Sequence, residues 1–330
     1  MIIDIFPHIL PPRYLKALRD KTPPNLYTYK WVEAIPTLSD IDLRFKIMDK
    51  YDGLVQVLTI GSPPIEKVVS PKDAIELAKI ANDEMAALVA KYPDRFVAAV
   101  ACLPMSDIDA ALKETDRAIT ELKFRGIQLY SDINETPIDS TEILPLYEKM
   151  AHYNLPILLH PQTEPSILET ANKNVSKQAW VIFGWPFQTT LAMCRIVFGG
   201  IFDKYPDLKI ITHHCGAMFP FFEARLAGSS DLFEKMGQKH GQYLSKRPVD
   251  YFRLFMGDTA LYGNTPALMC AHSILGADHI LFGTDMPYDN QIGYRHVRET
   301  IISVMRMNIP EYEKKMIFED NAKRIMRLPV

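Results

Sequence analysis

Short apolar runs alternate with longer amphipathic segments along the whole chain, and this alternation restricts the fold more than any other feature. Short apolar runs are typical of buried parallel strands, and the amphipathic segments between them are typical of helices that cover a sheet. The pattern predicts eight strand–helix units. The predicted strands lie at residues 1–6, 53–60, 96–103, 126–130, 155–159, 208–212, 253–256 and 279–282.

Three of the intervening segments have clear helical periodicity. Residues 72–91 place Ala74, Leu77, Ala78 and Met85 on one apolar face, and residues 106–122 and 140–153 are similar. Eight strands that alternate with helices close most economically into a (β/α)8 TIM barrel, with an open doubly wound sheet as the alternative. A chain of 330 residues with 48% hydrophobic residues is long enough to bury one such core, so we expect a single domain over residues 1–330.

Two stretches interrupt the strand–helix pattern. Residues 7–51 contain prolines at positions 11, 12, 23, 24 and 36 and are too long for a simple connection, and residues 163–188 are rich in aromatic side chains. We expect lid-like insertions at the barrel mouth, at about residues 9–51 and 163–188. The second insertion brings Trp185 to the wall of a substrate pocket.

Composition excludes several classes of partner. Lys and Arg total 37 against 40 for Asp and Glu, a formal net charge of −3, so no strong field attracts nucleic acid or an anionic membrane. We see no export signal and no run of the uncharged length that a membrane span needs. The cysteines are scattered without a CxxC pair, as in cytoplasmic proteins with reduced thiols. A small-molecule partner and a cytoplasmic location are therefore expected.

Residues able to do chemistry follow the ends of several predicted strands. In a closed barrel the carboxyl ends of all strands open on one face, so these residues converge although they are far apart in sequence. They follow the first, fifth, sixth and eighth runs and are His8, His160, His213, His214 and Asp285. The coincidence of several such residues predicts one site at the barrel mouth.

Imidazoles together with a carboxylate suit zinc, manganese or iron, whereas magnesium and calcium are held mainly by oxygen. We therefore predict a divalent transition metal, zinc first and manganese as the alternative. A histidine outside the metal shell would move protons, and His214 is the candidate. The spacing alone leaves open which residue is a ligand and which is a base.

Sequence blocks along nearly the whole chain resemble the amidohydrolase-related family. The blocks are DIFPH, LRFKIMDKYDGLVQVLT, LPILLHP, FGGIFDKYPDLKIITHHCGAMFPFFEAR, ILFGTDMPY and EDNAKRI. The family includes aminocarboxymuconate-semialdehyde decarboxylase and the decarboxylases of resorcylate, dihydroxybenzoate and carboxyvanillate, alongside hydratases and hydrolases. The resemblance implies a TIM-barrel enzyme that acts on a small carboxylic acid, and family members are often dimers or tetramers.

The resemblance also implies roles for individual residues. His8, His160 and Asp285 match metal-ligand positions, and His214, six residues before Pro220, matches the histidine that handles a proton or activates water. His8 is the second member of the family's opening HxH or ExH, but the first member here is Phe6. Because phenylalanine cannot coordinate a metal, the alternative is metal-free acid–base chemistry by His214 and Asp285.

Four side chains are assigned to substrate binding. Arg44 matches a position where related decarboxylases hold a substrate carboxylate, which a planar guanidinium binds through two parallel hydrogen bonds. Phe6 and Trp185 would contact a flat aromatic ring, and His213 would lie beside the substrate.

Three functions remain open from the sequence. The first is non-oxidative decarboxylation of an aromatic or unsaturated acid, with proton transfer by His214 or Asp285. The second is hydrolysis of a lactone, amide or imine by metal-bound water, which uses the same residues. The third is a non-catalytic barrel, which the loss of a ligand at Phe6 favours.

Overall fold

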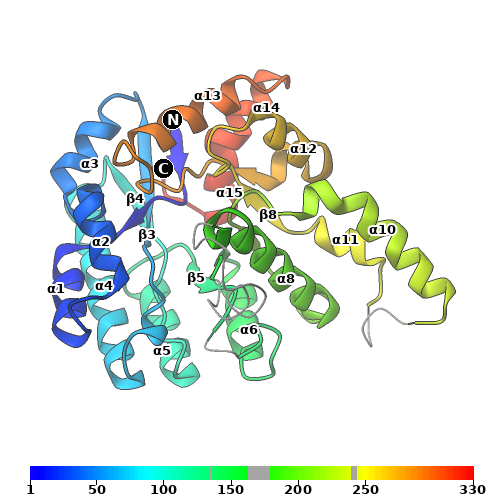
Figure 1. The fold of residues 1–330 in the computed structure, drawn as a ribbon, viewed down its shortest axis with the longest axis horizontal. Coiled ribbons are helices and arrows are strands. Elements are labelled where there is room, and N and C mark those ends of the chain that lie inside the picture. Colours follow the sequence, from blue (N-terminus) through cyan, green and yellow to red (C-terminus); the bar gives the residue numbers. More distant parts are fainter. Residues whose placement is uncertain (134–135, 163–178, 239–243) are drawn as a thin grey trace.

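Parallel strands form the centre of the fold, and helices surround them (Figure 1). The computed structural model describes residues 1–133, 136–162, 179–238 and 244–330. The strands are β1 (Ile2–Asp4), β2 (His8–Ile9), β3 (Leu54–Ile60), β4 (Phe96–Ala99), β5 (Ile127–Tyr130), β6 (Ile157–His160), β7 (Ile210–Thr212), β8 (Met256–Asp258) and β9 (Ile280–Leu281).

The strands close into a barrel. β1 and β2 both pair with β3, β3 pairs with β4, and β5 to β9 pair in sequence order, all in parallel. A bridge between Ala101 and Ile127 joins the two sheets, and the amide of Ile5 donates to the carbonyl of Phe282 at 3.0 Å on the other side. This closure confirms the TIM barrel and excludes the doubly wound alternative.

Each predicted run contains or overlaps a strand, although the seventh lies further along the chain than expected. Residues 253–256 were predicted, whereas β8 begins at Met256 and ends at Asp258. β2 was not predicted, because the chain after Phe6 reads as the start of a loop. The barrel interior is filled by apolar side chains such as Ile3, Val57 and Ile211, so the lower part of the barrel is a packed core.

Helices cover the outside of the barrel (Figure 1). The predicted segments 72–91, 106–122 and 140–153 overlap α4 (Pro71–Lys91), α5 (Ile108–Thr120) and α6 (Leu144–Tyr153). Ser70 caps α4 and Asp107 caps α5. The longer helices are α4 (Pro71–Lys91), α5 (Ile108–Thr120), α6 (Leu144–Tyr153), α8 (Trp185–Phe198), α10 (Phe219–Lys235), α12 (Thr265–Leu275) and α13 (Tyr294–Met305), and the shorter ones are α9 (Ile201–Lys204), α11 (Pro248–Phe252), α14 (Glu311–Lys315) and α15 (Asn321–Met326). The described residues also form short single turns: η1 (Pro36–Leu38), η2 (Ile65–Lys67), η3 (Trp180–Gly184), η4 (Ala277–His279) and η5 (Met316–Asp320).

The first insertion is helical. It forms α1 (Pro12–Lys21), α2 (Tyr27–Ala34) and α3 (Ile41–Met48), and α1 packs on α4. The amides of Arg13 and Tyr14 donate to the carboxylate of Glu84 in α4, at 3.0 and 2.8 Å, so α4 caps the start of α1. Trp31 of α2 contacts Tyr288, whose ring in turn lies 5.5 Å from that of His8, so this insertion reaches the barrel mouth.

Much of the second predicted insertion lies outside the described residues. The part from residue 179 onward forms η3 and the start of α8, which brings Trp185 toward the strand ends.

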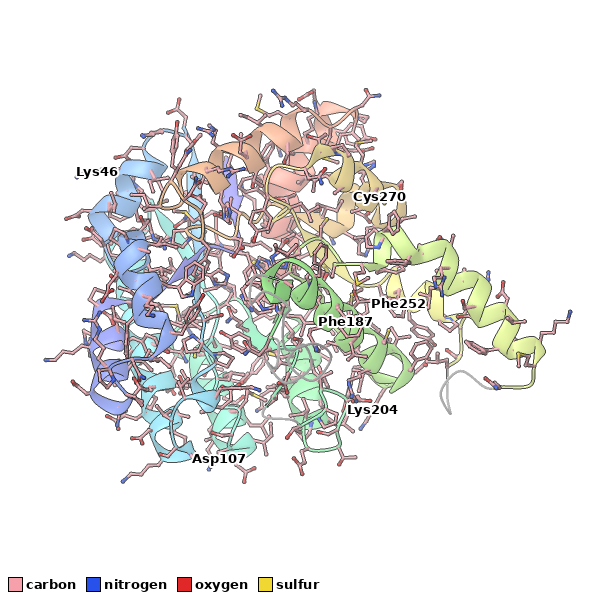
Figure 2. The ribbon with its side chains drawn as sticks, in the orientation of Figure 1. Lys46, Asp107, Phe187, Lys204, Phe252 and Cys270 are labelled. Atoms are coloured by element: carbon pink, nitrogen blue, oxygen red, sulfur yellow. The ribbon has the colours of Figure 1, made fainter. Side chains whose placement is uncertain are left out.

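One apolar stretch corrects the sequence analysis. By length and composition alone, residues 181–198 could cross a membrane, although Arg195 and several polar residues interrupt the stretch. In the barrel, α8 buries Met193, Ile196 and Val197 in the core. Phe198 at its end contacts Phe252 of α11, which is labelled in Figure 2. α8 is therefore one of the helices that cover the barrel, although only a third of the stretch is buried.

Candidate active site

The structure brings together, at the carboxyl end of the barrel, every strand-end residue that the sequence singled out. His8 begins β2, His160 ends β6, His213 and His214 follow β7, and Asp285 follows β9. All of these side chains are buried. Parallel strands that close into a barrel place their carboxyl ends on one face, which is why residues so distant in sequence meet here.

His8 and His160 are held with one ring nitrogen toward the barrel wall. Nδ1 of His8 donates to the carbonyl of Ile60 at 3.1 Å, and Nδ1 of His160 donates to the carbonyl of Pro161 at 2.7 Å. A carbonyl only accepts, so in both rings Nδ1 carries the proton and Nε2 keeps its lone pair. Burial lowers the pKa of both histidines, that of His160 furthest, and therefore favours these neutral rings.

Asp258, at the end of β8, holds the ring of His213. One carboxylate oxygen accepts from Nδ1 of His213, and the other accepts from the amides of Cys215 and Ala260 at 3.2 and 3.0 Å. Burial lowers the pKa of His213, but the carboxylates of Asp258 and Asp285 outweigh it and raise that pKa to about 10.

The carboxylate of Asp285 lies at the centre of the cluster. Its Oδ1 is 3.3 Å from Nε2 of His8 and 3.4 Å from Nε2 of His213, and its Oδ2 is 3.8 Å from Nε2 of His214. Burial opposes ionisation, but the surrounding imidazoles, that of His213 first and then those of His214 and His8, outweigh it and hold the pKa of Asp285 well below its usual range. Asp285 is thus a buried anion among imidazoles.

Left-handed backbone places His213 and His214 in the same site. Neighbouring side chains on a strand point to opposite faces, but φ is +58° at His214 and +54° at Cys215, so the chain turns sharply after β7. The two imidazole rings lie 4.0 Å apart as a result. Gly257 on β8 permits this turn, because a Cβ there would lie 2.9 Å from the Cα of Cys215.

The cluster fits a divalent transition metal ion. One ligand atom from each of His8, His160 and His213 lies within 4.8 Å of the others, and His213, His214 and Asp285 form a second, overlapping group. Within the described residues, Nε2 of His8 and Nε2 of His213 are buried without a hydrogen-bond partner. Buried polar atoms normally have a partner, so these orphaned nitrogens, beside an anionic carboxylate, indicate a cation site.

Aromatic side chains form the walls of the site. Trp185 at the start of α8 stacks near His214, with ring centroids 6.4 Å apart, and Tyr262 lies almost parallel to the same imidazole at 6.4 Å. Tyr262 was not predicted, because nothing in the loop after β8 distinguishes it from a surface tyrosine. Phe6, predicted to contact substrate, is fully buried and stacks on His213 with centroids 4.1 Å apart.

Arg44 of α3 is packed against the backbone of His8. An arginine that binds a substrate carboxylate is expected to reach the cavity instead. Its side chain is 0% exposed. The guanidinium donates to the carbonyl of His8, to the carbonyl of Thr37 at 3.3 Å and to Oε1 of Gln56 at 2.9 Å. These acceptors orient Arg44 toward the backbone that carries His8.

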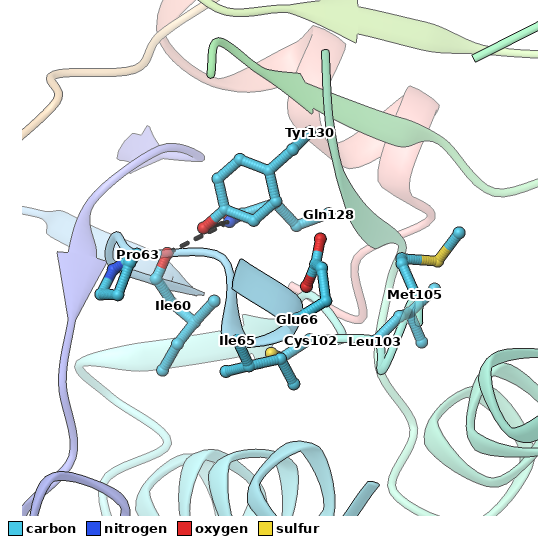
Figure 3. Close-up of a pocket in the computed structure, with 9 residues that line it drawn as sticks. All are labelled: Ile60, Pro63, Ile65, Glu66, Cys102, Leu103, Met105, Gln128 and Tyr130. Carbon is cyan, nitrogen blue, oxygen red and sulfur yellow. Dashed lines mark hydrogen bonds between the residues drawn. The ribbon is translucent and has the colours of Figure 1, made fainter. Parts of the chain in front are cut away.

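A small hollow of about 10 Å³, enough for roughly one water molecule, lies beside the histidines, at the ends of β3, β4 and β5 (Figure 3). Its rim touches the cluster: the carbonyl of Ile60 binds both His8 and Gln128, and the ring of Tyr130 lies 5.1 Å from that of His160. Apolar side chains form most of the lining, with Glu66, Gln128 and Tyr130 as the polar members. The lining residues are Ile60, Pro63, Ile65, Glu66, Cys102, Leu103, Met105, Gln128 and Tyr130.

Glu66 makes a testable contribution to the pH dependence of stability. Burial raises its pKa from 4.5 to about 7, so the folded protein favours the protonated acid. For an acid whose pKa is raised on folding, the stabilising contribution is present below pH 4.5 and is lost as the pH rises through 7. Relative to Glu66→Gln, the wild type should lose up to about 3 kcal/mol of unfolding free energy over this range. Urea unfolding at a series of pH values measures this difference.

The exposed residue Glu142 provides the control for this prediction. Glu142→Gln should follow the wild-type pH profile closely. Parallel profiles for the wild type and Glu66→Gln would show that Glu66 has no such raised pKa.

The site and fold define a barrel enzyme with a divalent-metal centre, and comparison with known proteins gives the family. The sequence profile of the family described as "Amidohydrolase" matches residues 39–328. Gamma-resorcylate decarboxylase of Polaromonas sp. (strain JS666) is 32% identical over 314 residues, which cover 90% of this chain and 91% of that protein. The chain belongs to the amidohydrolase family, which confirms the resemblance drawn from the sequence blocks.

Solved structures agree with this assignment. The crystal structure of 2,6-dihydroxybenzoate decarboxylase with bound 2,6-dihydroxybenzoate has a TM-score of 0.81 and 28% identity, and the match covers 99% of this chain and 98% of that one. The dihydroxybenzoic acid decarboxylase of Polaromonas sp. JS666, solved with manganese and the inhibitor 2-nitroresorcinol, also has a TM-score of 0.81 and 28% identity, over 99% of this chain and 96% of that one.

Proposed function

We propose that this protein removes carbon dioxide, without oxidation, from an aromatic carboxylic acid, and that the reaction depends on a divalent metal ion. The observation that carries the proposal is the Asp285 carboxylate, which faces the ring nitrogens of His8, His213 and His214 at the barrel mouth. Relatives that are named as decarboxylases of dihydroxybenzoates support the choice of reaction.

The surroundings of the cluster suit a flat ring. The rings of Trp185 and Tyr262 both lie near that of His214, with centroids 6.4 Å away in each case. Of the side chains that the sequence assigns to substrate binding, we retain Trp185, because it is only partly buried and its ring lies near those of His160 and His214. Apolar walls exclude water and thereby strengthen the electrostatic interactions within the site.

His8, His160 and Asp285 are the ligands proposed from the sequence for the metal. When bound, the ion would hold the substrate carboxylate and a neighbouring hydroxyl oxygen and would lower the cost of negative charge there. His214 and Asp285 carry the proton, which is transferred to the ring carbon that bears the carboxylate. The bond to the carboxyl carbon then breaks, its electron pair returns to the ring, and carbon dioxide leaves.

A direct assay separates the candidate functions. Protein loaded with Mn²⁺ or Zn²⁺ and incubated with a panel of hydroxybenzoates, 2,6-dihydroxybenzoate first, is expected to release one carbon dioxide for each substrate consumed. A hydrolase of lactones, amides or imines shares the same residues but releases none. A non-catalytic barrel consumes no substrate in either assay, and the absence of carbon dioxide across the panel would overturn the proposal.

The variant His214→Ala tests the proton-transfer role. Nε2 of His214 lies 3.8 Å from Oδ2 of Asp285, and the rings of Trp185 and Tyr262 lie near the imidazole. Because general acid–base groups contribute about 10²- to 10⁴-fold to rate, we expect kcat to fall at least about 100-fold with metal content unchanged. Initial rates of carbon dioxide release, with metal analysis of the same sample, measure both quantities. Full activity in this variant would rule out His214 as the proton carrier.

Other properties follow from the same proposal. Zinc and manganese both suit imidazole and carboxylate ligands, so both are compared in the assay. Exposed apolar side chains on α10, such as Phe221 at 79% exposure, support a homo-oligomer, either a dimer or a tetramer. The four free cysteines support a cytoplasmic location.

A further inference from the structure

We infer that His213 is itself a metal ligand, and that Asp258 and Phe6 hold its ring in place for that purpose. The inference rests on the metal dependence proposed above. His213 then has a different role from the substrate contact expected from the sequence. It follows β7 and supplies a ligand atom that Phe6, after the first strand, cannot supply.

The orientation of the His213 ring supports ligation. Asp258 accepts from Nδ1, which turns Nε2 toward His8 and His160, and Nε2 has no hydrogen-bond partner among the described residues. A carboxylate bonded to the far nitrogen is the usual partner of a metal-bound histidine, because it fixes the ring and strengthens the donor. His213 is only 1% exposed, so its free nitrogen faces the cluster and not the open mouth.

Phe6 contributes packing and no ligand atom. Its ring stacks on His213 at 18° between ring planes, with centroids 4.1 Å apart, and also contacts His8. The stacked ring of Phe6 restricts rotation of the His213 side chain. The ligand set can therefore be complete although Phe6 has no donor atom, because His213, which stacks on Phe6, provides a nitrogen.

The two oxygens of the Asp285 carboxylate face different histidines. Oδ1 of Asp285 faces Nε2 of His213 at 3.4 Å and Nε2 of His8 at 3.3 Å, whereas Oδ2 faces Nε2 of His214 at 3.8 Å. His213 therefore lies on the side of the carboxylate where the other ligand atoms gather. His214 faces the other oxygen and has Trp185 and Tyr262 near its ring, and we assign it to proton transfer.

Asparagine at position 213 gives a sharp test. Its side-chain amide can take the place of Nδ1 and keep the hydrogen bond to Asp258, but it has no atom that reaches the place of Nε2. Mn²⁺ affinity is measured by competition with a fluorescent chelator, and electron spin-echo spectroscopy of the bound Mn²⁺ counts the coordinated imidazoles. We expect His213→Asn to weaken Mn²⁺ binding more than about 100-fold, beyond the range for residues that only orient ligands, and to lose one imidazole from the count.

Two further variants complete the design. Asp258→Asn should weaken Mn²⁺ binding about 10- to 100-fold with the imidazole count unchanged, because it removes the orienting carboxylate and leaves the ligand. His272, whose Nε2 bonds Glu313 outside the site, is the matched control, and His272→Asn should leave the affinity unchanged. Circular dichroism and melting temperature establish that each variant is folded.

Each outcome decides the inference. A folded His213→Asn variant with wild-type affinity and imidazole count would overturn it, and if that variant does not fold, unchanged affinity in Asp258→Asn would do so. Wild-type protein that binds no Mn²⁺ would overturn the inference together with the metal dependence of the proposed function. Wild-type binding that is insensitive to position 213 would overturn the inference alone.

Discussion

Replacement of Asp285 by asparagine is expected to lower kcat/KM for carbon dioxide release by at least about 10³-fold. The carboxylate is the anionic group that faces His8, His213 and His214 together, and the amide has neither the charge nor the basicity to replace it. Acid–base groups contribute up to about 10⁴-fold, and this variant also weakens the metal site. Steady-state rates with metal-saturated protein measure the effect.

Asp289 provides the control for this variant. Its carboxylate accepts from the backbone amides of Gln291, Gly293 and His296 in the loop that follows the site, so it is a local structural acid. Asp289→Asn should change the melting temperature more than the chemical step. Equal losses of kcat/KM in the two variants would mean that Asp285 has no special part in the chemistry.

Replacement of Arg44 by methionine is expected to lower the free energy of unfolding by about 3 kcal/mol. The substitution leaves the carbonyls of His8 and Thr37 and Oε1 of Gln56 without their donor in a fully buried place. Each unsatisfied buried group costs about 1–3 kcal/mol, and part of this cost is relieved by relaxation. Urea denaturation followed by circular dichroism gives the difference directly.

Exposed arginine provides the comparison. Arg247 forms an ion pair with Asp231 in which both side chains are more than half exposed, so Arg247→Met should change stability by less than about 1 kcal/mol. Arg44→Lys should lie between the two, because an ammonium group cannot reproduce the spread of donors of a guanidinium. If Arg44→Met unfolded with the same free energy as the wild type, the hydrogen bonds of Arg44 would not stabilise the fold.

The strand pattern predicted the barrel because a parallel sheet covered by helices imposes a simple sequence signature. Each strand is buried on both sides, so it reads as a short apolar run. The meeting of His8, His160 and Asp285 followed from the same geometry, since the ends of parallel strands share one face. These features depend on local sequence and on topology, both of which a single sequence contains.

Other features depend on contacts that a single sequence does not display. The start of α1 is capped by Glu84, about seventy residues away, so the insertion read as a proline-rich loop. Arg44 carries the same side chain whether it faces a substrate or the carbonyl of His8, and only the packing of α3 on the barrel decides. The rings of His213 and His214 lie side by side because φ is positive after β7. Positive φ angles at residues other than glycine are hard to predict from sequence.

The most direct test of the account is anomalous diffraction at the manganese edge from crystals soaked with Mn²⁺ and 2,6-dihydroxybenzoate. The account predicts one strong peak among the side chains of His8, His160, His213 and Asp285, with the carboxylate of the ligand against it. A well-occupied peak elsewhere, or ligand bound with no manganese near these side chains, would contradict it.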